Sequence, residues 1–373
     1  MSHPKLLVGT SKGLVVFTFS ENAISKVDIH FKGLPVSMVY VDETNHNWWA
    51  GLSHRHWGEK LYVSNDQGAS WCVSGLPSYQ GFDYRPGKPA SLKKLWCMST
   101  GGKDPNKLWL GTEPGGLFFS DDYGKSFHLN ESLWNHPSRQ DDKQWFGTGK
   151  DFPFIHSILI DPRDSNHIYA GVSCAGVFES TNGGKSWTPC NNGLVAGYLP
   201  KADPEVGHDP HQMLMCQAQP EVIWQQNHCG IFRTRDGGKL WDNVSGKNLV
   251  TLSSGAVSRQ WPSYGFALAI DNSNPETAWV IPAESDESRI PVDLELQVLK
   301  TIDGGANWIS YSTGLPQNNA FDLVLRHGFA KYQNILAFGT TNGNLYCSFN
   351  LGERWTVLSQ NLASVNSVVF NVS

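Results

Sequence analysis

Six side chains that can bind a transition metal lie in a few short segments of the sequence. The segments are SHRHWGE from Ser53, GKDFPFIHSI from Gly149, GHDPHQ from Gly207 and QNHCG from Gln226. Neutral imidazole is the commonest metal ligand in proteins, and a carboxylate can complete or orient the site. The candidate ligands for one transition-metal ion are His54, His56, His156, Asp209, His211 and His228. The alternative interpretation is that these side chains bind the backbone of their own loops, because no single element carries a dense ligand motif.

A second set of residues has the chemistry that acts on sugars. Cleavage of a glycosidic bond uses two carboxyl groups, one protonated and one ionised, and flat aromatic faces pack well on sugar rings. The candidate catalytic residues are Glu113, Glu284, Asp286 and Arg289. The candidate ligand-binding residues are Arg55, Trp57, Glu59, Asp151, Trp261 and Tyr264. Each aromatic side chain could instead pack its own loop, as could Tyr79, Trp134 and Trp145.

The elements that position these residues come from a repeat. The pattern Ser/Thr-x-Asp/Asn-x-Gly-x-x-Trp/Phe starts at Ser64, Ser120, Ser180, Thr234, Thr301 and Ser348, with spacings of 47 to 67 residues. In this pattern the Asp or Asn accepts hydrogen bonds from turn N–H groups, the Gly permits a positive φ, and the aromatic ring can be buried between sheets. We therefore expect these acidic residues to stabilise turns and not to catalyse a reaction.

Each copy of this eight-residue pattern is called a box below. A second pattern, of two apolar strands separated by a short Gly-containing turn, precedes each box. Clear copies are LLVGTSKGLVVF from Leu6, LWLGTEPGGLFF from Leu108, IYAGVSCAGVFE from Ile168 and LAFGTTNGNLYC from Leu336. With three weaker copies the repeats number seven. Further strands are expected at Ile155, His211, Phe266 and Phe321, each ahead of its repeat.

The repeats predict an all-β fold, a seven-bladed β-propeller of four-stranded antiparallel blades. The chain starts with the second strand of blade 1 and ends with VNSVVFNV from Val365, so the C-terminal strand is expected to complete blade 1 and close a single domain over residues 1–373. Loops that enter the first strand of a blade, and loops that join the second and third strands, would open on one face around the channel. The candidate residues above all belong to such loops.

Composition excludes several classes of function. The net charge is −5, only 17% of residues are charged, and no run of like charges is present, so neither nucleic acid nor a membrane surface is an expected partner. No apolar stretch is long enough to span a bilayer, and no secretory signal precedes the first strand. The seven cysteines form no CxxC pair, which is typical of a reduced protein, so we expect a cytoplasmic location.

The boxes and the blade pattern resemble those of the Asp-box (BNR-repeat) propellers, which include sialidases, xyloglucan-type glycoside hydrolases, sortilin-like receptors and photosystem II assembly factors. HRHWGE, GKDFPFIHSI, HDPHQM, NHCGIFRTRDGGKLW and PAESDESRIP are similar to segments of single-domain bacterial proteins described as sialidase-like or glycosyl-hydrolase-like. The resemblance implies the fold and a glycosyl-hydrolase-like ancestry. In true sialidases an Arg-Ile-Pro motif precedes the first box, whereas here SRIP lies at Ser288 to Pro291.

Three hypotheses about function follow. In the first hypothesis, the protein binds a carbohydrate or other small polar ligand at the face that carries the loops. If it is an enzyme, it is a glycoside hydrolase that cleaves this ligand. Alternatively, it is a metal-dependent enzyme that uses the histidines. In the third hypothesis it is a non-catalytic scaffold with a protein partner.

Overall fold

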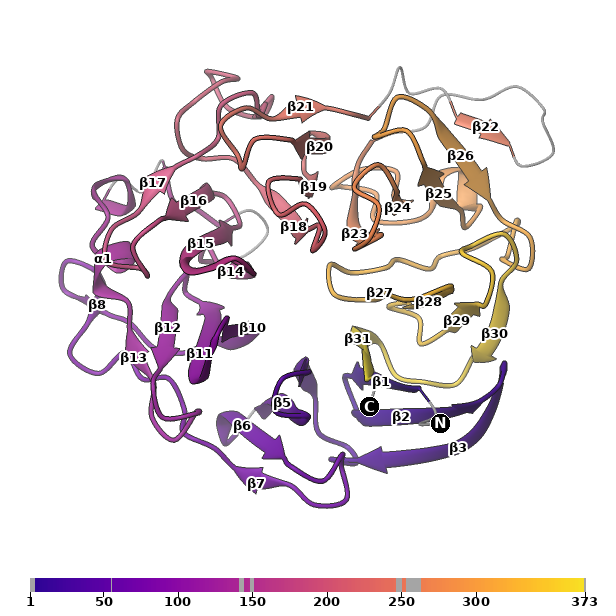
Figure 1. Cartoon of the computed structure of the whole chain (residues 1–373), viewed down its shortest axis with the longest axis horizontal. Coiled ribbons are helices and arrows are strands. Elements are labelled where there is room, and N and C mark those ends of the chain that lie inside the picture. The colour runs from indigo at the N-terminus through magenta and orange to yellow at the C-terminus, as the bar shows by residue number, and fades with distance from the viewer. Residues whose placement is uncertain are drawn as a thin grey trace. The chain divides into compact units, whose positions relative to one another are not determined.

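A computed structural model describes residues 4–371 except residues 55, 141–143, 148–150, 246–249 and 253–262. The protein is an all-β seven-bladed propeller, and its seven blade sheets follow one another in chain order (Figure 1). Contacts divide the chain into two units, residues 34–210 and residues 1–33 with 211–373. Among the described residues, no helix is long and apolar enough to cross a membrane.

Residues 34–210 form three blades, each a four-stranded antiparallel meander. The strands of the first are β4 (Val36–Asp42), β5 (Asn47–His54), β6 (Gly58–Ser64) and β7 (Cys72–Val73). Those of the second are β10 (Lys94–Gly101), β11 (Asp104–Glu113), β12 (Leu117–Ser120) and β13 (His128–Leu129). Those of the third are β14 (Ile155–Asp161), β15 (Asp164–Val172), β16 (Gly176–Ser180) and β17 (Thr188–Pro189).

Two loops that follow blades of this unit contain structure of their own. The first holds a small hairpin of β8 (Asp83–Arg85) and β9 (Lys88–Pro89). The second begins with α1 (Glu131–Trp134), followed by the 3-10 helix η1 (Pro137–Gln140). Both segments carry buried aromatic side chains, so they are packed elements and not open loops.

The other unit holds four blades. Blade 1 has the spatial order β3 (Ala23–His30), β2 (Gly13–Ser20), β1 (Lys5–Thr10), β31 (Val365–Asn371). Blade 5 contains β18 (Pro210–Met215), β19 (Ile223–Asn227), β20 (Gly230–Thr234) and β21 (Asp242–Asn243). Blade 6 contains β23 (Gly265–Ile270), β24 (Ala278–Pro282), β25 (Val298–Thr301) and β26 (Trp308–Tyr311), with η2 (Val292–Leu294) between the middle two. Blade 7 contains β27 (Phe329–Tyr332), β28 (Ile335–Gly339), β29 (Leu345–Ser348) and β30 (Thr356–Ser359).

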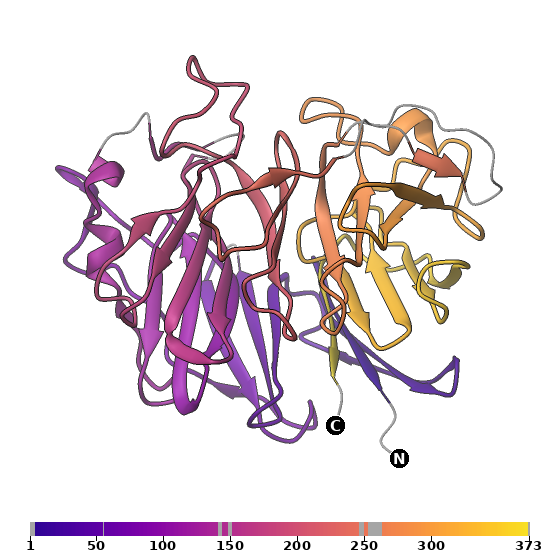
Figure 2. The same ribbon diagram turned by 45° about the horizontal axis from the view of Figure 1, so that its top comes forward.

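The C-terminal strand completes blade 1, as the sequence predicted. β31 pairs antiparallel with β1, with Leu7 opposite Val369 and Val8 opposite Val368. Both termini are drawn beside this blade in the two views of the whole chain (Figures 1 and 2). Val365, Val368 and Phe370 enter the same apolar cluster as residues of β1 and β2.

Two strands differ from the prediction. The apolar segment from Phe321 is not the first strand of blade 7, which starts at Phe329 instead. Phe321 is exposed, while the Asp322 carboxylate accepts hydrogen bonds from Thr340 Oγ1 and Asn344 Nδ2, both at 2.7 Å, so this segment is held as a loop. In blade 6, a fifth strand, β22 (Val250–Leu252), pairs parallel with β26.

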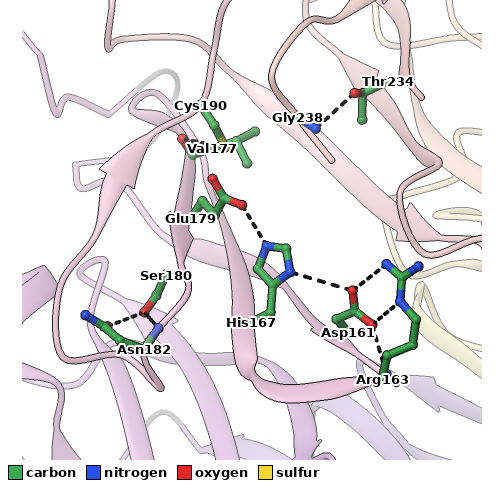
Figure 3. Close-up of polar contacts among 10 residues, drawn as sticks. All are labelled: Asp161, Arg163, His167, Val177, Glu179, Ser180, Asn182, Cys190, Thr234 and Gly238. Carbon is green, nitrogen blue, oxygen red and sulfur yellow. Dashed lines mark hydrogen bonds and ion pairs between the residues drawn. The ribbon is translucent and has the colours of Figure 1, made fainter. Parts of the chain in front are cut away.

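The six boxes are turns stabilised by the same hydrogen bonds. In the third, Ser180 Oγ donates to Asn182 Oδ1 at 3.0 Å (Figure 3). The same Oγ accepts from Gly184 N at 2.9 Å. The corresponding Thr234 Oγ1 accepts from Gly238 N at 2.9 Å. Hydrogen bonds from Ser70 and Ser64 lower the pKa of the Asp66 carboxyl to about 2. These geometries confirm that the box carboxylates serve the turns.

Candidate functional site

Two carboxylates from neighbouring sheets of the unit of residues 34–210 form the first candidate site. Glu59 stands at the start of β6, and its Oε1 accepts a hydrogen bond from Ser53 Oγ at 2.5 Å. Glu113 is the last residue of β11 and is only 7% exposed. Trp96 Nε1 donates to Glu113 Oε2 at 3.3 Å. Both carboxylates thus lie at strand ends, where the backbone of a rigid sheet positions them.

The environment raises the proton affinity of the Glu59 carboxyl. Burial raises the pKa of the Glu59 carboxyl, and the negative charge of Glu113 raises it further. Hydrogen bonds from Ser53 and from the Leu95 backbone, together with the positive charge of Lys94, act in the opposite direction. A carboxyl group with a raised pKa beside a second carboxylate is the arrangement used for acid–base work on glycosidic bonds.

Aromatic side chains support this pair from below. The Trp96 ring stacks on Phe154 with centroids 4.1 Å apart and an angle of 11° between the planes. The Lys94 ammonium lies 3.9 Å from the Trp96 centroid. The Trp96 ring thus packs within the chain, and its indole N–H positions Glu113.

The other predicted catalytic residues lie in a loop that follows β24, in the other unit. Glu284, Asp286 and Arg289 are all exposed. Arg289 Nε donates to the backbone oxygen of Asp286 at 3.0 Å, and the Asp286 carboxylate lies 3.7 Å from His228 Nε2. The structure therefore groups Asp286 and Arg289 with a histidine from the predicted metal set.

His211 and His228 lie side by side, with ring centroids 5.8 Å apart. His211 is buried, and its Nδ1 lies 2.6 Å from Gly265 O. Because a carbonyl only accepts, Nδ1 carries the proton and Nε2 carries the lone pair. Asp209, which accepts hydrogen bonds from Ser173 Oγ and Cys174 N, is two residues from His211 on the same stretch of chain. The potential ligand atoms of His211 and His228, which belong to the same unit, lie within 4.8 Å of one another.

The remaining predicted histidines have local structural contacts. His54 Nδ1 accepts from the backbone N–H groups of His56 and Trp57, both at 3.2 Å, which caps the hairpin between β5 and β6. His156 is buried, and its Nδ1 lies 2.9 Å from Ser157 Oγ. Among the described residues, none of these three joins a group of three potential metal ligands.

The predicted ligand-binding aromatics divide into two kinds. Trp57 is 75% exposed at its hairpin, whereas Tyr264 is buried against His211, His228 and Phe266. Tyr79, Trp134 and Trp145 are buried in their own segments, as the alternative interpretation expected. Asp151 is exposed, and Arg55 and Trp261 lie outside the described residues.

Sequence reasoning missed two charged clusters. In the first, His167 Nε2 lies 2.6 Å from Glu179 Oε1, and Arg163 binds Asp161 next to it (Figure 3). In the second, Arg85 and Arg139 line a hollow between the β8–β9 hairpin and the α1–η1 segment. Arg85 and Arg139 are 54 residues apart in the chain, so no short sequence pattern contains both. The length of the two loops that carry them was the one feature of the sequence that could have indicated the second cluster.

Comparisons with known proteins agree with the fold and give a distant relationship. No family model matches the chain. The chain is 22% identical over 319 residues to a probable oligoxyloglucan-reducing end-specific xyloglucanase from Neosartorya fischeri, covering 79% of this chain and 35% of that protein. It is 21% identical over 265 residues to the oligoxyloglucan-reducing end-specific xyloglucanase of Emericella nidulans, covering 66% and 30%. The chain thus spans about a third of the length of these relatives.

Solved structures with a similar fold come from several kinds of protein. An ancestral GH74 enzyme matches with a TM-score of 0.55 at 17% identity, over 90% of this chain and 38% of that one. YCF48 bound to D1 peptide matches with a TM-score of 0.52 at 14% identity, over 92% and 89%. A putative 6-phosphogluconolactonase from Bacteroides fragilis matches with a TM-score of 0.56 at 11% identity, over 100% and 98%. At these identities the structures show the propeller fold alone.

Proposed function

We propose that this protein binds a carbohydrate and hydrolyses one of its glycosidic bonds with Glu59 and Glu113. The observation that carries the proposal is the pairing of two partly or fully buried carboxylates at adjacent strand ends. The distant sequence similarity to two xyloglucanases supports a glycan as the ligand. The narrower resemblance to sialidase-like proteins, stated above, stays a prediction.

The two carboxyl groups have distinct roles in this proposal. Glu59, whose pKa is raised by burial, is the proton donor to the leaving glycosidic oxygen. Glu113, which accepts a hydrogen bond from the Trp96 indole N–H, acts at the anomeric carbon, either through a water molecule or directly. The Ser53 hydroxyl holds the Glu59 carboxyl in a fixed orientation. Substrate binding must expose this pair, and the exposed Trp57 lies on the same β5–β6 hairpin as Glu59.

The test is hydrolysis of xyloglucan oligosaccharides and chromogenic glycosides by the Glu59→Gln and Glu113→Gln variants. Each substitution keeps the side-chain volume, and each is expected to lower kcat by about a hundredfold or more while the protein still binds the substrate. Glu284→Gln, at an exposed glutamate, is the matched control and should retain activity. Equal activity of all three variants and the unmodified protein would refute the assignment.

A second candidate function is metal-dependent chemistry at His211 and His228. The specific observation is the hydrogen bond from His211 Nδ1 to Gly265 O, because metal-binding histidines are usually oriented by such a bond from the other ring nitrogen. The two imidazoles suit zinc or iron, and such an ion would polarise a bound water molecule.

Elemental analysis of protein purified without an affinity tag or chelator tests the metal site. About one transition-metal ion per chain is expected, and the His211→Ala/His228→Ala double variant should lose it. His56→Ala removes an exposed imidazole outside this group and should keep the metal. Metal-free protein that also fails to bind zinc, iron, manganese or copper would exclude this candidate.

A further inference from the structure

A hollow of about 230 Å³ lies within the unit of residues 34–210 and opens to solvent. The β8–β9 hairpin forms one side, and the α1–η1 segment forms the other. Its lining includes Asp83, Tyr84, Arg85, Trp134 and Arg139. None of the sequence patterns assigned a function to these residues.

Arg139 is buried, with 2% of its surface exposed, although it lines this hollow. Its Nη2 donates to the backbone oxygen of Pro114 at 3.3 Å, and its guanidinium carbon lies 3.5 Å from the Trp134 ring centroid. Arg139 Nη1 is buried without a hydrogen-bond partner within the part of the chain that the structure describes. A buried arginine normally pairs with a carboxylate, so this donor lacks the usual complement.

Arg85 brings a second guanidinium to the same hollow. It donates to two backbone oxygens, that of Arg139 and, at 3.1 Å, that of Trp145. Burial of Arg139 lowers the pKa of its guanidinium to about 10, and the positive charge of Arg85 acts in the same direction. Among the described lining residues, the carboxylate is that of exposed Asp83, whose Oδ2 accepts from Gly87 N at 3.0 Å within the hairpin turn. The described lining therefore holds two positive charges, and its carboxylate is bound within the hairpin turn.

We propose that this hollow binds a small organic anion, whose carboxylate or phosphate group accepts hydrogen bonds from Arg139 Nη1 and from the Arg85 guanidinium. A planar fork of N–H donors matches both kinds of oxyanion, and the low local polarity around Trp134 strengthens each charged hydrogen bond. A neutral ligand would leave the buried Arg139 donor without an acceptor, so the site discriminates by charge. The inference does not depend on the proposed glycosidase activity.

Isothermal titration calorimetry of the full chain with four probes tests the proposal. The probes are inorganic phosphate, glucose 6-phosphate and galacturonate, with glucose as the neutral control. At least one anion is expected to bind at least about tenfold more tightly than glucose, and added salt should weaken that binding. Binding of the two phosphates assigns the group as phosphate, and binding of galacturonate alone assigns it as carboxylate.

Variants connect the binding to the two arginines. Arg139→Lys and Arg85→Gln should each raise the Kd of the bound anion by about tenfold or more. Asp83→Asn, at an exposed residue, removes a carboxylate from the lining and should lower that Kd by about threefold. The matched control is Arg163→Gln, at a half-exposed arginine paired with Asp161, which should not change it.

Because Arg139 is buried, its variant requires a thermal unfolding measurement alongside the titration. If that variant does not fold, Arg85→Gln and Asp83→Asn decide the outcome. The proposal is overturned if the folded wild-type chain binds no anion more tightly than glucose at concentrations up to about 10 mM. It is equally overturned if the anion binds with the same Kd to the folded Arg85→Gln and Asp83→Asn variants as to the wild type.

Discussion

Glu59 is the residue whose ionisation the structure perturbs in the direction that catalysis would need. Since the positive charge of Lys94 lowers the pKa of Glu59, Lys94→Met should raise that pKa further. For a general acid, the alkaline limb of the kcat/KM profile then moves to higher pH, because Glu59 stays protonated longer. A ¹³C NMR titration of the glutamate carboxyls measures the same shift without requiring turnover.

The control for this experiment is Lys93→Met, which removes an exposed lysine one residue away. That variant should leave the titration of Glu59 where it is. If both variants move the Glu59 pKa equally, the effect reflects the net charge of the molecule and not the pairing described here.

His167 gives a prediction about the pH dependence of stability. The hydrogen bond with Glu179, with the charges of Glu179 and Asp161, raises the pKa of His167 above its usual value, against a smaller effect of burial. Its stabilising contribution is fully present below the unfolded-state pKa of about 6.5 and is lost as the pH rises through the folded-state pKa. His167→Gln should therefore lower the free energy of unfolding by about 1 kcal/mol at pH 5.5 and by much less at pH 8.5.

Urea unfolding of the variant and the unmodified protein at the two pH values measures this difference. His128→Gln, at an exposed histidine, is the control and should show no pH-dependent loss. Equal losses for His167→Gln at both pH values would mean that neutral hydrogen bonding and packing, and not the charge, carry the contribution.

The role of a single residue could be predicted from the sequence when its interaction partners lie close to it along the chain. The box residues could be predicted because Ser64, Asp66 and Gly68 bind one another within one turn. Glu59 and Glu113 were both named, but sequence placed them in different roles, since their coupling runs between two sheets. Arg85 and Arg139 were missed because they meet across two loops whose folds no short pattern encodes.

At the scale of turns and strands, Asn130 connects elements of neighbouring blades. It caps α1 by accepting from Leu133 N, its Oδ1 also accepts from Trp187 Nε1 at 2.9 Å, and its Nδ2 donates to Gly184 O at 2.8 Å. Asn130→Ala removes the acceptor of the Leu133 N and Trp187 Nε1 donors, whereas Gly184 O keeps its hydrogen bond from Ser132 Oγ. We expect it to lower the free energy of unfolding by about 2–4 kcal/mol, as measured by denaturant titration.

Asn243→Ala is the matched control, because Asn243 is an exposed residue of β21 with a hydrogen bond to the following Ser245 N. It should change stability by less than about 1 kcal/mol. If Asn130→Ala is equally mild, the connection between the box turn and α1 does not contribute to stability as its geometry suggests.

Of the four strands that were predicted ahead of a repeat, three were placed correctly and one was not. β14, β18 and β23 lie where the sequence predicted them, within a residue. The segment from Phe321 has a similar alternation, but its Asp322 is buried and bound to Thr340 and Asn344, so tertiary hydrogen bonds override the strand pattern. The parallel strand β22 could not be predicted, because a three-residue strand depends on its partner β26.

At the scale of the whole molecule, the two chain ends meet in blade 1. β1 has two neighbours in its sheet, β2 and β31, so removal of β31 leaves its backbone groups unpaired on one side. The same change removes Val365, Val368 and Phe370 from the cluster that also contains Leu6 and Val8. Burial of each such side chain contributes about 1.5–3 kcal/mol, so loss of all three removes a large part of the stability of a typical domain.

Deletion of residues 364–373 should therefore lower the free energy of unfolding by more than about 5 kcal/mol or prevent folding, whereas deletion of residues 372–373 alone should have little effect. Thermal unfolding followed by circular dichroism and by tryptophan fluorescence measures both. If residues 1–373 behave as the one domain that the repeats predict, the two probes will report a single coincident transition in the full chain. Two separated transitions would mean that residues 34–210 unfold independently of the unit that β31 completes. An unchanged midpoint after the longer deletion would show that the pairing of β1 with β31 is dispensable.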